Sequence, residues 1–126
     1  MPSDFTELDV YRLAMEVGTS VGSKVRGWSH FDRSVIGIQL ARAAHGIAAN
    51  LAEAAGRAHV KDRRLFIYYA RGSARETRCW LDKAQLEGLL SEPDWSQNRD
   101  AVMRIEKMLT RLARAQRGEA GRKAKA

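Results

Sequence analysis

The sequence contains little cysteine and proline and no long uninterrupted apolar run. Its 126 residues include one cysteine, Cys79, and two prolines, so an internal disulfide is excluded. No segment approaches the roughly 20 apolar residues that a membrane-spanning helix needs. The opening MPSDFTELDV is acidic and lacks the apolar stretch of a secretory signal. These absences predict a cytoplasmic protein with no membrane partner.

Motifs for metal, nucleotide or nucleophilic chemistry are also missing. No glutamate is followed three residues later by a histidine, as a di-iron site in a helical bundle requires. The three histidines lie on different segments without ligand spacing, and neither G-x-x-x-x-G-K-[ST] nor G-x-G-x-x-G occurs. Cys79 has no CxxC partner. We therefore expect no metal, no cofactor and no enzymatic activity.

The sequence is instead rich in the helix formers alanine, leucine, arginine and glutamate. Apolar residues recur every three or four positions in four segments, approximately 6–25, 34–57, 61–87 and 93–116. Short connections between long helices favour antiparallel neighbours. The expected fold is an all-α, up-down-up-down four-helix bundle.

Residues with known capping preferences are found near the ends of these segments. Asp32 or Ser34 is expected to cap the start of the second helix. Gly88 is placed to end the third, and Ser91 precedes the fourth, with Pro93 in its first turn. We expect the bundle to occupy residues 1–117 and the basic tail 118–126 to be disordered.

The second helix is apolar on nearly its whole circumference. One face is expected to enter the core: Ile36, Leu40, Ala43, Ala44, Ile47, Leu51, Ala54 and Ala55. The opposite face is small and largely apolar, with Arg42, His45 and Glu53 among its residues, and it supplies the predicted oligomer interface: Val35, Ile38, Gly46, Ala49 and Ala52. A helix that is apolar all round is buried all round, which predicts contact with a second copy. The alternative is a weakly exposed alanine surface, because alanine is the best helix former.

Positive charge is concentrated in two segments of a chain whose net charge is +7. Residues 57–83 carry eight Lys/Arg against three acids, and residues 111–126 carry six against one. On a helical projection the third helix has an inner face: Phe66, Tyr69, Ala70, Ser73, Thr77, Trp80, Leu81 and Ala84. The opposite face carries a basic stripe: Arg64, Tyr68, Arg71, Arg75 and Arg78. Arginine donates paired hydrogen bonds to phosphate, and a tyrosine can stack on an unpaired base. The predicted nucleic-acid-binding residues are Arg42, Arg57, Lys61, Arg64, Tyr68, Arg71, Arg75 and Arg78. The alternative is a solvated helix face, although such faces usually mix charges of both signs.

Several polar residues within the second and third helices are assigned structural roles: Gln39, Asn50, Glu53, Ser73 and Glu76. Buried acids are usually paired. We expect Glu53 and Glu76 to pair with Arg42, with Arg57 or with an arginine of another subunit, rather than to act in acid–base catalysis.

The central part of the chain resembles a known protein family. The residues that carry the resemblance are Phe5 to Tyr11, Gln39, Arg42-Ala43-Ala44, Ile47, Asn50-Leu51-Ala52-Glu53, Gly56-Arg57, Phe66, Ala70, Gly72-Ser73 and Glu76. They resemble the small bacterial four-helix bundles encoded in intervening sequences of large-subunit ribosomal RNA genes. That family includes the accessory variability proteins of diversity-generating retroelements.

The resemblance implies a homopentameric ring with a positively charged surface or channel, nucleic-acid binding and no enzymatic activity. In the retroelement branch it implies association with a reverse transcriptase. The leading hypothesis is therefore a non-enzymatic oligomeric scaffold that contacts RNA or DNA phosphates with low sequence specificity. The alternative is a protein-interaction module whose basic stripe docks an acidic partner such as a reverse transcriptase.

Overall fold

The computed structural model of the protein describes the backbone of residues 5–125, and the side chains of residues 5–116 except Glu7. A 3-10 turn, η1 (Phe5–Glu7), precedes the first long helix, α1 (Asp9–Arg26). The remaining elements are a short helix α2 (His30–Asp32), a π-helical turn η2 (Arg33–Gly37) and the long helices α3 (Ile38–Ala55), α4 (Val60–Leu86) and α5 (Glu92–Lys125). Residues 5–125 contain no strand, so the all-helical prediction is confirmed.

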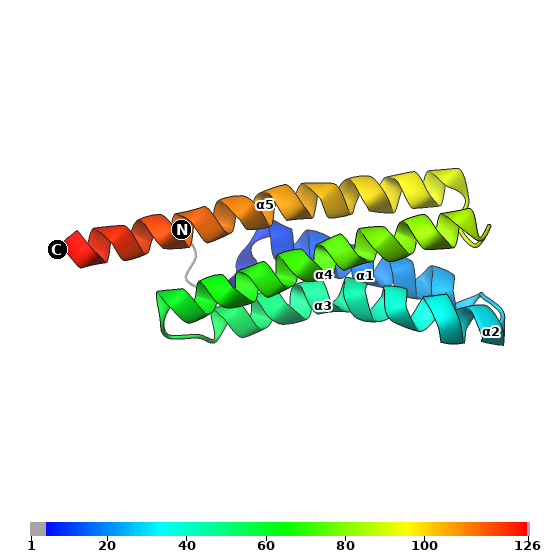
Figure 1. Ribbon diagram of the computed structural model, residues 1–126, viewed down its shortest axis with the longest axis horizontal. Helices are drawn as coiled ribbons and strands as arrows, with labels where there is room; N and C mark the ends of the chain where they lie inside the picture. The colour runs from blue at the N-terminus through cyan, green and yellow to red at the C-terminus, as the bar shows by residue number, and fades with distance from the viewer. Residues whose placement is uncertain (1–4, 126) are drawn as a thin grey trace.

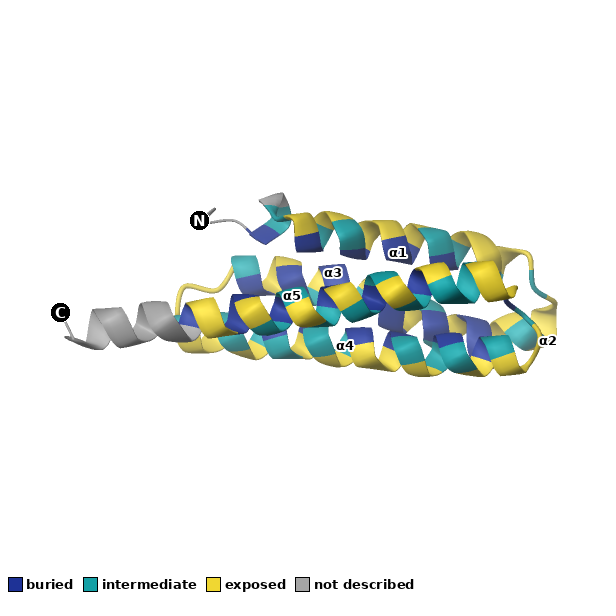
Figure 2. Cartoon of the chain, turned by 90° about the horizontal axis from the view of Figure 1, so that it is seen from above, coloured by how far each residue is buried: buried dark blue, intermediate teal, exposed yellow. Residues whose placement is uncertain are grey.

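The four long helices lie side by side along one axis and alternate in direction (Figure 1). α1 packs against α3 and α5, and α4 packs against the same two helices. Buried residues line the inward faces of all four helices (Figure 2). This is the expected antiparallel arrangement, and it makes α4 and α5 neighbours along their length.

The second helix begins earlier than predicted, at His30, with Ser29 as its N-cap. The Ser29 hydroxyl accepts a hydrogen bond from the backbone N–H of Asp32 at 3.2 Å and donates one to the Asp32 carboxylate at 2.9 Å. Ser29 is therefore the N-cap, and Asp32, three residues later, is its hydrogen-bond partner. The expectation that Asp32 or Ser34 is the cap was wrong. The π turn then packs closely on the end of α1, since a Cβ at Gly37 would lie only 2.7 Å from Val25 Cγ1.

The predicted signals at the α4–α5 connection are confirmed. Gly88 adopts φ +75°, and its N–H bonds to the carbonyl of Gln85 at 3.0 Å while Leu89 N–H bonds to that of Ala84 at 2.9 Å. These two bonds satisfy carbonyls that a helix end leaves without partners. Ser91 caps α5 by accepting the N–H of Asp94 at 3.2 Å.

The backbone of α5 continues as helix to Lys125, past its expected end at Gln116. It therefore runs through most of the segment 118–126 that was predicted to be disordered. That segment is rich in Ala, Lys, Arg and Glu and contains no proline, a composition compatible with a helix. Its side chains lie outside the described residues.

All four long helices contribute to the core: α1 supplies Val10, Val17 and Val21, and the largest fully buried side chains of the other three are Leu40, Ile47, Leu51, Ile67, Leu81, Ile105 and Leu109. The inner face predicted for α3 is buried except for Ala55, which is half-buried. The inner face predicted for α4 is buried at Ala70, Thr77, Leu81 and Ala84, but Tyr69 is 50% exposed, and Ile67 and Ala74, which were not predicted, are fully buried. α4 is packed against two helices at once, and its basic stripe consequently lies beside the core, facing α5.

Candidate nucleic-acid interface

A basic groove runs along the outer surface between α4 and α5. It has a volume of about 620 Å³ and is lined by Tyr68, Arg71, Gly72 and Arg75 from α4 and by Glu106, Lys107, Thr110, Arg111 and Arg114 from α5. Five of these side chains are basic and one is acidic, which leaves four positive charges in excess. We call this surface the α4/α5 groove.

On the α4 wall, Arg71 is held from two sides. Its guanidinium lies over the ring of Tyr68, with Cζ 4.8 Å from the ring centroid, and its Nη1 donates to Thr110 Oγ1 at 3.3 Å. Tyr68 and Arg71 are three residues apart, so they are neighbours on one helix face. The guanidinium is therefore oriented before any ligand arrives, and little side-chain entropy remains to be lost on binding.

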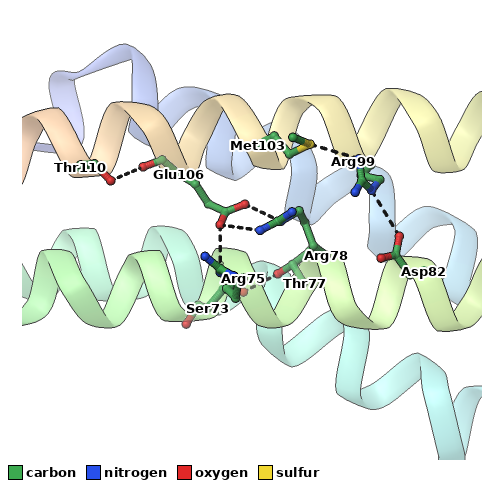
Figure 3. A network of polar contacts seen from close by, with 9 residues as sticks. All are labelled: Ser73, Arg75, Thr77, Arg78, Asp82, Arg99, Met103, Glu106 and Thr110. Atoms are coloured by element: carbon green, nitrogen blue, oxygen red, sulfur yellow. Dashed lines mark hydrogen bonds and ion pairs between the residues drawn. The ribbon is translucent and has the colours of Figure 1, made fainter.

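Glu106 is the single acid of the groove, and it is the centre of a polar network that joins α4 to α5 (Figure 3). Its Oε1 accepts a hydrogen bond from Arg78 Nη2 at 3.1 Å, and its Oε2 lies 2.6 Å from Arg78 Nε without the alignment of a hydrogen bond. Arg75 Nε approaches Oε1 at 3.4 Å. Glu106 and Arg78 are 14% and 23% exposed, whereas Arg75 is 75% exposed. Arg78 is thus largely committed to the fold, while Arg75 remains accessible to a ligand.

The α5 wall supplies three cations that were missing from the predicted site: Lys107, Arg111 and Arg114. They are spaced by four and three residues and so share one helix face. Lys107, Arg111 and Arg114 make no hydrogen bond or ion pair with the described residues. The signal that could have identified them is this spacing on the fourth helix, opposite an arginine stripe on its antiparallel neighbour.

Two of the predicted binding residues lie elsewhere. Arg57 lies in the connection between α3 and α4. Its guanidinium covers the ring of Phe66, with Cζ 4.6 Å from the ring centroid, and its Nη2 pairs with Glu53 Oε2 at 3.2 Å. Arg42 is exposed on α3. Neither residue lines the α4/α5 groove, because α3 is the neighbour of α4 on the other side.

Three other predicted residues of α4 do not line the α4/α5 groove: Lys61, Arg64 and Arg78, of which Arg78 binds Glu106. Lys61 is exposed in the first turn of α4. Arg64 is half-buried, and its Nε is buried with no hydrogen-bond partner among the described residues. Of the eight predicted binding residues, the groove brings together Tyr68, Arg71 and Arg75.

The outer face of α3 carries most of the predicted oligomer interface. Val35 and Ile38 are 49% and 45% exposed, and Ala49 and Ala52 are exposed as well. Gly46 was assigned to this face incorrectly. It is half-buried, and a Cβ there would lie 3.0 Å from Ser73 Oγ, so it allows close packing between α3 and α4.

The predicted structural polar residues divide into two groups. Asn50 Nδ2 donates to Ser73 Oγ at 3.3 Å and ties α3 to α4, and Glu53 forms the ion pair with Arg57. For Gln39 and Glu76 no hydrogen bond or ion pair is found within the described part of the chain, and Glu76 is exposed on α4.

The described residues contain neither a metal-binding cluster nor a membrane-spanning helix. No group of three His, Cys, Asp or Glu side chains is placed to hold a metal ion there. No described helix has both the length and the apolar character needed to cross a membrane.

Comparison with known proteins identifies the family. Residues 6–111 match the family described as 23S rRNA-intervening sequence protein, and the chain belongs to this family. The fold is also that of a solved structure, a protein of unknown function from the S23 ribosomal protein family of Bacteroides thetaiotaomicron. The two chains are 19% identical with a TM-score of 0.74, over 82% of this chain and 97% of the other. A search of curated proteins gave no match.

Proposed function

We propose that the protein is a cytoplasmic, non-enzymatic scaffold that binds RNA or DNA by its phosphates in the α4/α5 groove. The observation that carries the proposal is the excess of cations on two facing helices, with three of the five free of internal partners within the described residues. Convergent positive charge in a concave surface concentrates the field and favours polyanions. Phosphate contacts fix position but carry no base information, so sequence specificity is expected to be low.

The number of cations sets the expected salt dependence. Each neutralised phosphate contributes a slope of about −0.9 to log K against log salt for duplex DNA and about −0.7 for a single strand. If the four basic side chains of the α4/α5 groove other than Arg75, which Glu106 pairs, contact phosphate, the slope per groove is about −2.8 to −3.6. A surface with scattered charges would give a shallower dependence.

The experiment is fluorescence anisotropy with purified, nuclease-treated protein at several salt concentrations. Labelled RNA, single-stranded DNA and duplex DNA of equal length are the ligands. We expect binding that weakens steeply with salt at the slope given above. Absence of binding at low salt, or affinity that does not change with salt, would refute the proposal.

We further propose that the protein acts as a ring-like homo-oligomer, a pentamer by resemblance to its family. The supporting observation is the outer face of η2 and α3, on which the apolar residues Val35, Ile38, Ala49 and Ala52 are exposed. Apolar side chains left exposed along one face of a helix favour contact with a second chain, and Arg42 and His45 on the same face would supply its polar contacts. A ring would repeat the α4/α5 groove once per subunit, and contacts made by several grooves to one strand would add through effective concentration.

A second candidate function is docking of an acidic protein such as a reverse transcriptase. The observation that favours it is Glu106, because a carboxylate already pairs with Arg75 and Arg78 at the groove. A carboxylate-rich protein segment would use the same arginine geometry. Pull-down from nuclease-treated extract distinguishes the two functions: retention of a protein partner favours docking, and its loss with nuclease favours nucleic-acid binding.

A further inference from the structure

We propose that the α4/α5 groove selects a single strand over a duplex, with an unpaired base stacked on the Arg71–Tyr68 pair and the strand passing close to Gly72. This inference rests on the proposed nucleic-acid function and specifies its ligand. The ligand chemistry is a phosphodiester strand with exposed bases, which single-stranded RNA and DNA share.

Packing within the described residues does not explain why position 72 is a glycine. It lies in the middle of α4, a helix of 27 residues, where glycine is the least favourable residue after proline. A Cβ at Gly18 would approach His45 Nδ1 at 2.8 Å, so packing accounts for that glycine, but a Cβ at Gly72 would meet no heavy atom within 4 Å. Gly72 nevertheless lines the α4/α5 groove. The space that a methyl group would fill is therefore open to a ligand.

The neighbours of Gly72 supply the contacts that a single strand needs. Tyr68 and Arg75 lie one turn before and after it on the same helix face, so Gly72 leaves a gap between an aromatic ring and an exposed cation. The Arg71 guanidinium is supported by the Tyr68 ring on one side. Bases stack on arginine planes as they do on aromatic rings, and such stacking contributes to single-strand binding with any base.

A duplex cannot use these features. Its bases are stacked on one another and its outer surface presents phosphates, so the Arg71–Tyr68 pair would meet no base face. Along each wall the cations recur at about 5 to 6 Å, given the helical rise of 1.5 Å per residue. An extended strand lying in the groove can be contacted by basic side chains of both α4 and α5, whereas a duplex would contact only the outer edges of the groove.

The test compares Gly72→Ala with Gly22→Ala as a matched control. Gly22 is a helix-interior glycine on α1 whose added Cβ would meet only His45 Nε2, at 3.9 Å. Neither variant should lower the melting temperature. We expect an increase of about 2 to 5 °C, because alanine is a better helix former than glycine. We expect Gly72→Ala to weaken binding of labelled oligo-uridine and oligo-thymidine about tenfold, the loss of one stacked base. Duplex binding by Gly72→Ala, and all binding by Gly22→Ala, should be unchanged.

A second pair of variants tests the stacking pair itself. Tyr68→Phe keeps a ring beneath Arg71 and should retain the preference for single strands, whereas Tyr68→Leu fills similar apolar space and should lose it. Comparing oligo-uridine with oligo-deoxyuridine, which differs from it only in lacking the 2′-hydroxyl, shows whether the ribose hydroxyl contributes.

Several results would overturn the inference. Equal affinity of the wild-type protein for single strands and duplex would do so, as would unchanged single-strand binding by Gly72→Ala. A change in solution mass with Gly72→Ala would identify Gly72 as a contact between copies of the chain instead. These outcomes are distinct from failure of the proposed function, in which the wild-type protein binds no nucleic acid at low salt.

Discussion

Replacing Glu106 by glutamine should strengthen nucleic-acid binding, because Glu106 competes with phosphate for the groove arginines. The carboxylate approaches Arg75 at 3.4 Å and Arg78 at 2.6 Å. Glutamine keeps the shape and one hydrogen-bond acceptor but removes the charge. Arg75, which is 75% exposed, would then be available to a ligand phosphate.

The size of the effect follows from counterion release. One additional phosphate contact steepens the salt slope by about 0.7 for a single strand or 0.9 for duplex DNA. Between 200 and 50 mM salt, a fourfold change, the affinity ratio of Glu106→Gln to wild type should therefore grow about threefold. The cost to the fold is the loss of a partly buried ion pair to Arg78, and the retained amide acceptor limits this cost to about 1 to 2 kcal/mol.

Anisotropy titrations at four or more salt concentrations measure the effect, with Glu76→Gln as control. Glu76 is an exposed acid on the same helix as Arg75, and its replacement changes the net charge equally. We expect its slope to equal that of the wild type. The reasoning is refuted if Glu106→Gln and Glu76→Gln behave alike, or if a folded Glu106→Gln variant binds more weakly than wild type.

Three further predictions concern assembly and stability. Ala49→Glu, on the outer face of α3, should reduce the particle mass in light scattering to that of smaller species, and an unchanged mass would show that this face is not the interface. Gly88→Ala should lower the free energy of unfolding by about 1 kcal/mol in urea titration, because only glycine adopts φ +75° without strain; no loss would contradict the assigned helix end. Ile67→Ala should cost about 2 to 5 kcal/mol and Tyr69→Ala less than half of that, because Ile67 is fully buried and Tyr69 is 50% exposed; the reverse order would contradict this burial of α4.

Much of the fold could be predicted because its signals are local. The four helices follow from the apolar period of their own segments. Gly88 ends α4 and Ser91 caps α5, and each acts only on residues a few positions away. The start of the second helix was missed although its signal, Ser29 followed three residues later by Asp32, was present. The π-helical turn η2 follows α2 directly and departs from the period of an α-helix. The apolar periodicity of the second helix therefore did not extend back to Ser29.

The site was predicted less well because it depends on which helices are neighbours. A single-helix projection placed the arginine stripe on α4 but could not show that α5 faces it. Glu106 and the α5 cations Lys107, Arg111 and Arg114 join the site only through that packing. Charge alone also could not distinguish arginines that are available to a ligand from arginines that stabilise the fold. Arg63 is of the second kind, because its Nε donates to the buried Gln116 at 3.0 Å.

The central claim is that the α4/α5 groove, and not the overall charge of +7, binds nucleic acid. The most direct test compares the salt slopes of Arg111→Gln and Arg26→Gln. Both arginines are exposed and both changes remove one positive charge, but Arg111 lines the groove and Arg26 ends α1. We predict that Arg111→Gln weakens binding and lowers the slope by nearly one, while Arg26→Gln leaves both unchanged. Equal effects of the two variants would contradict the account.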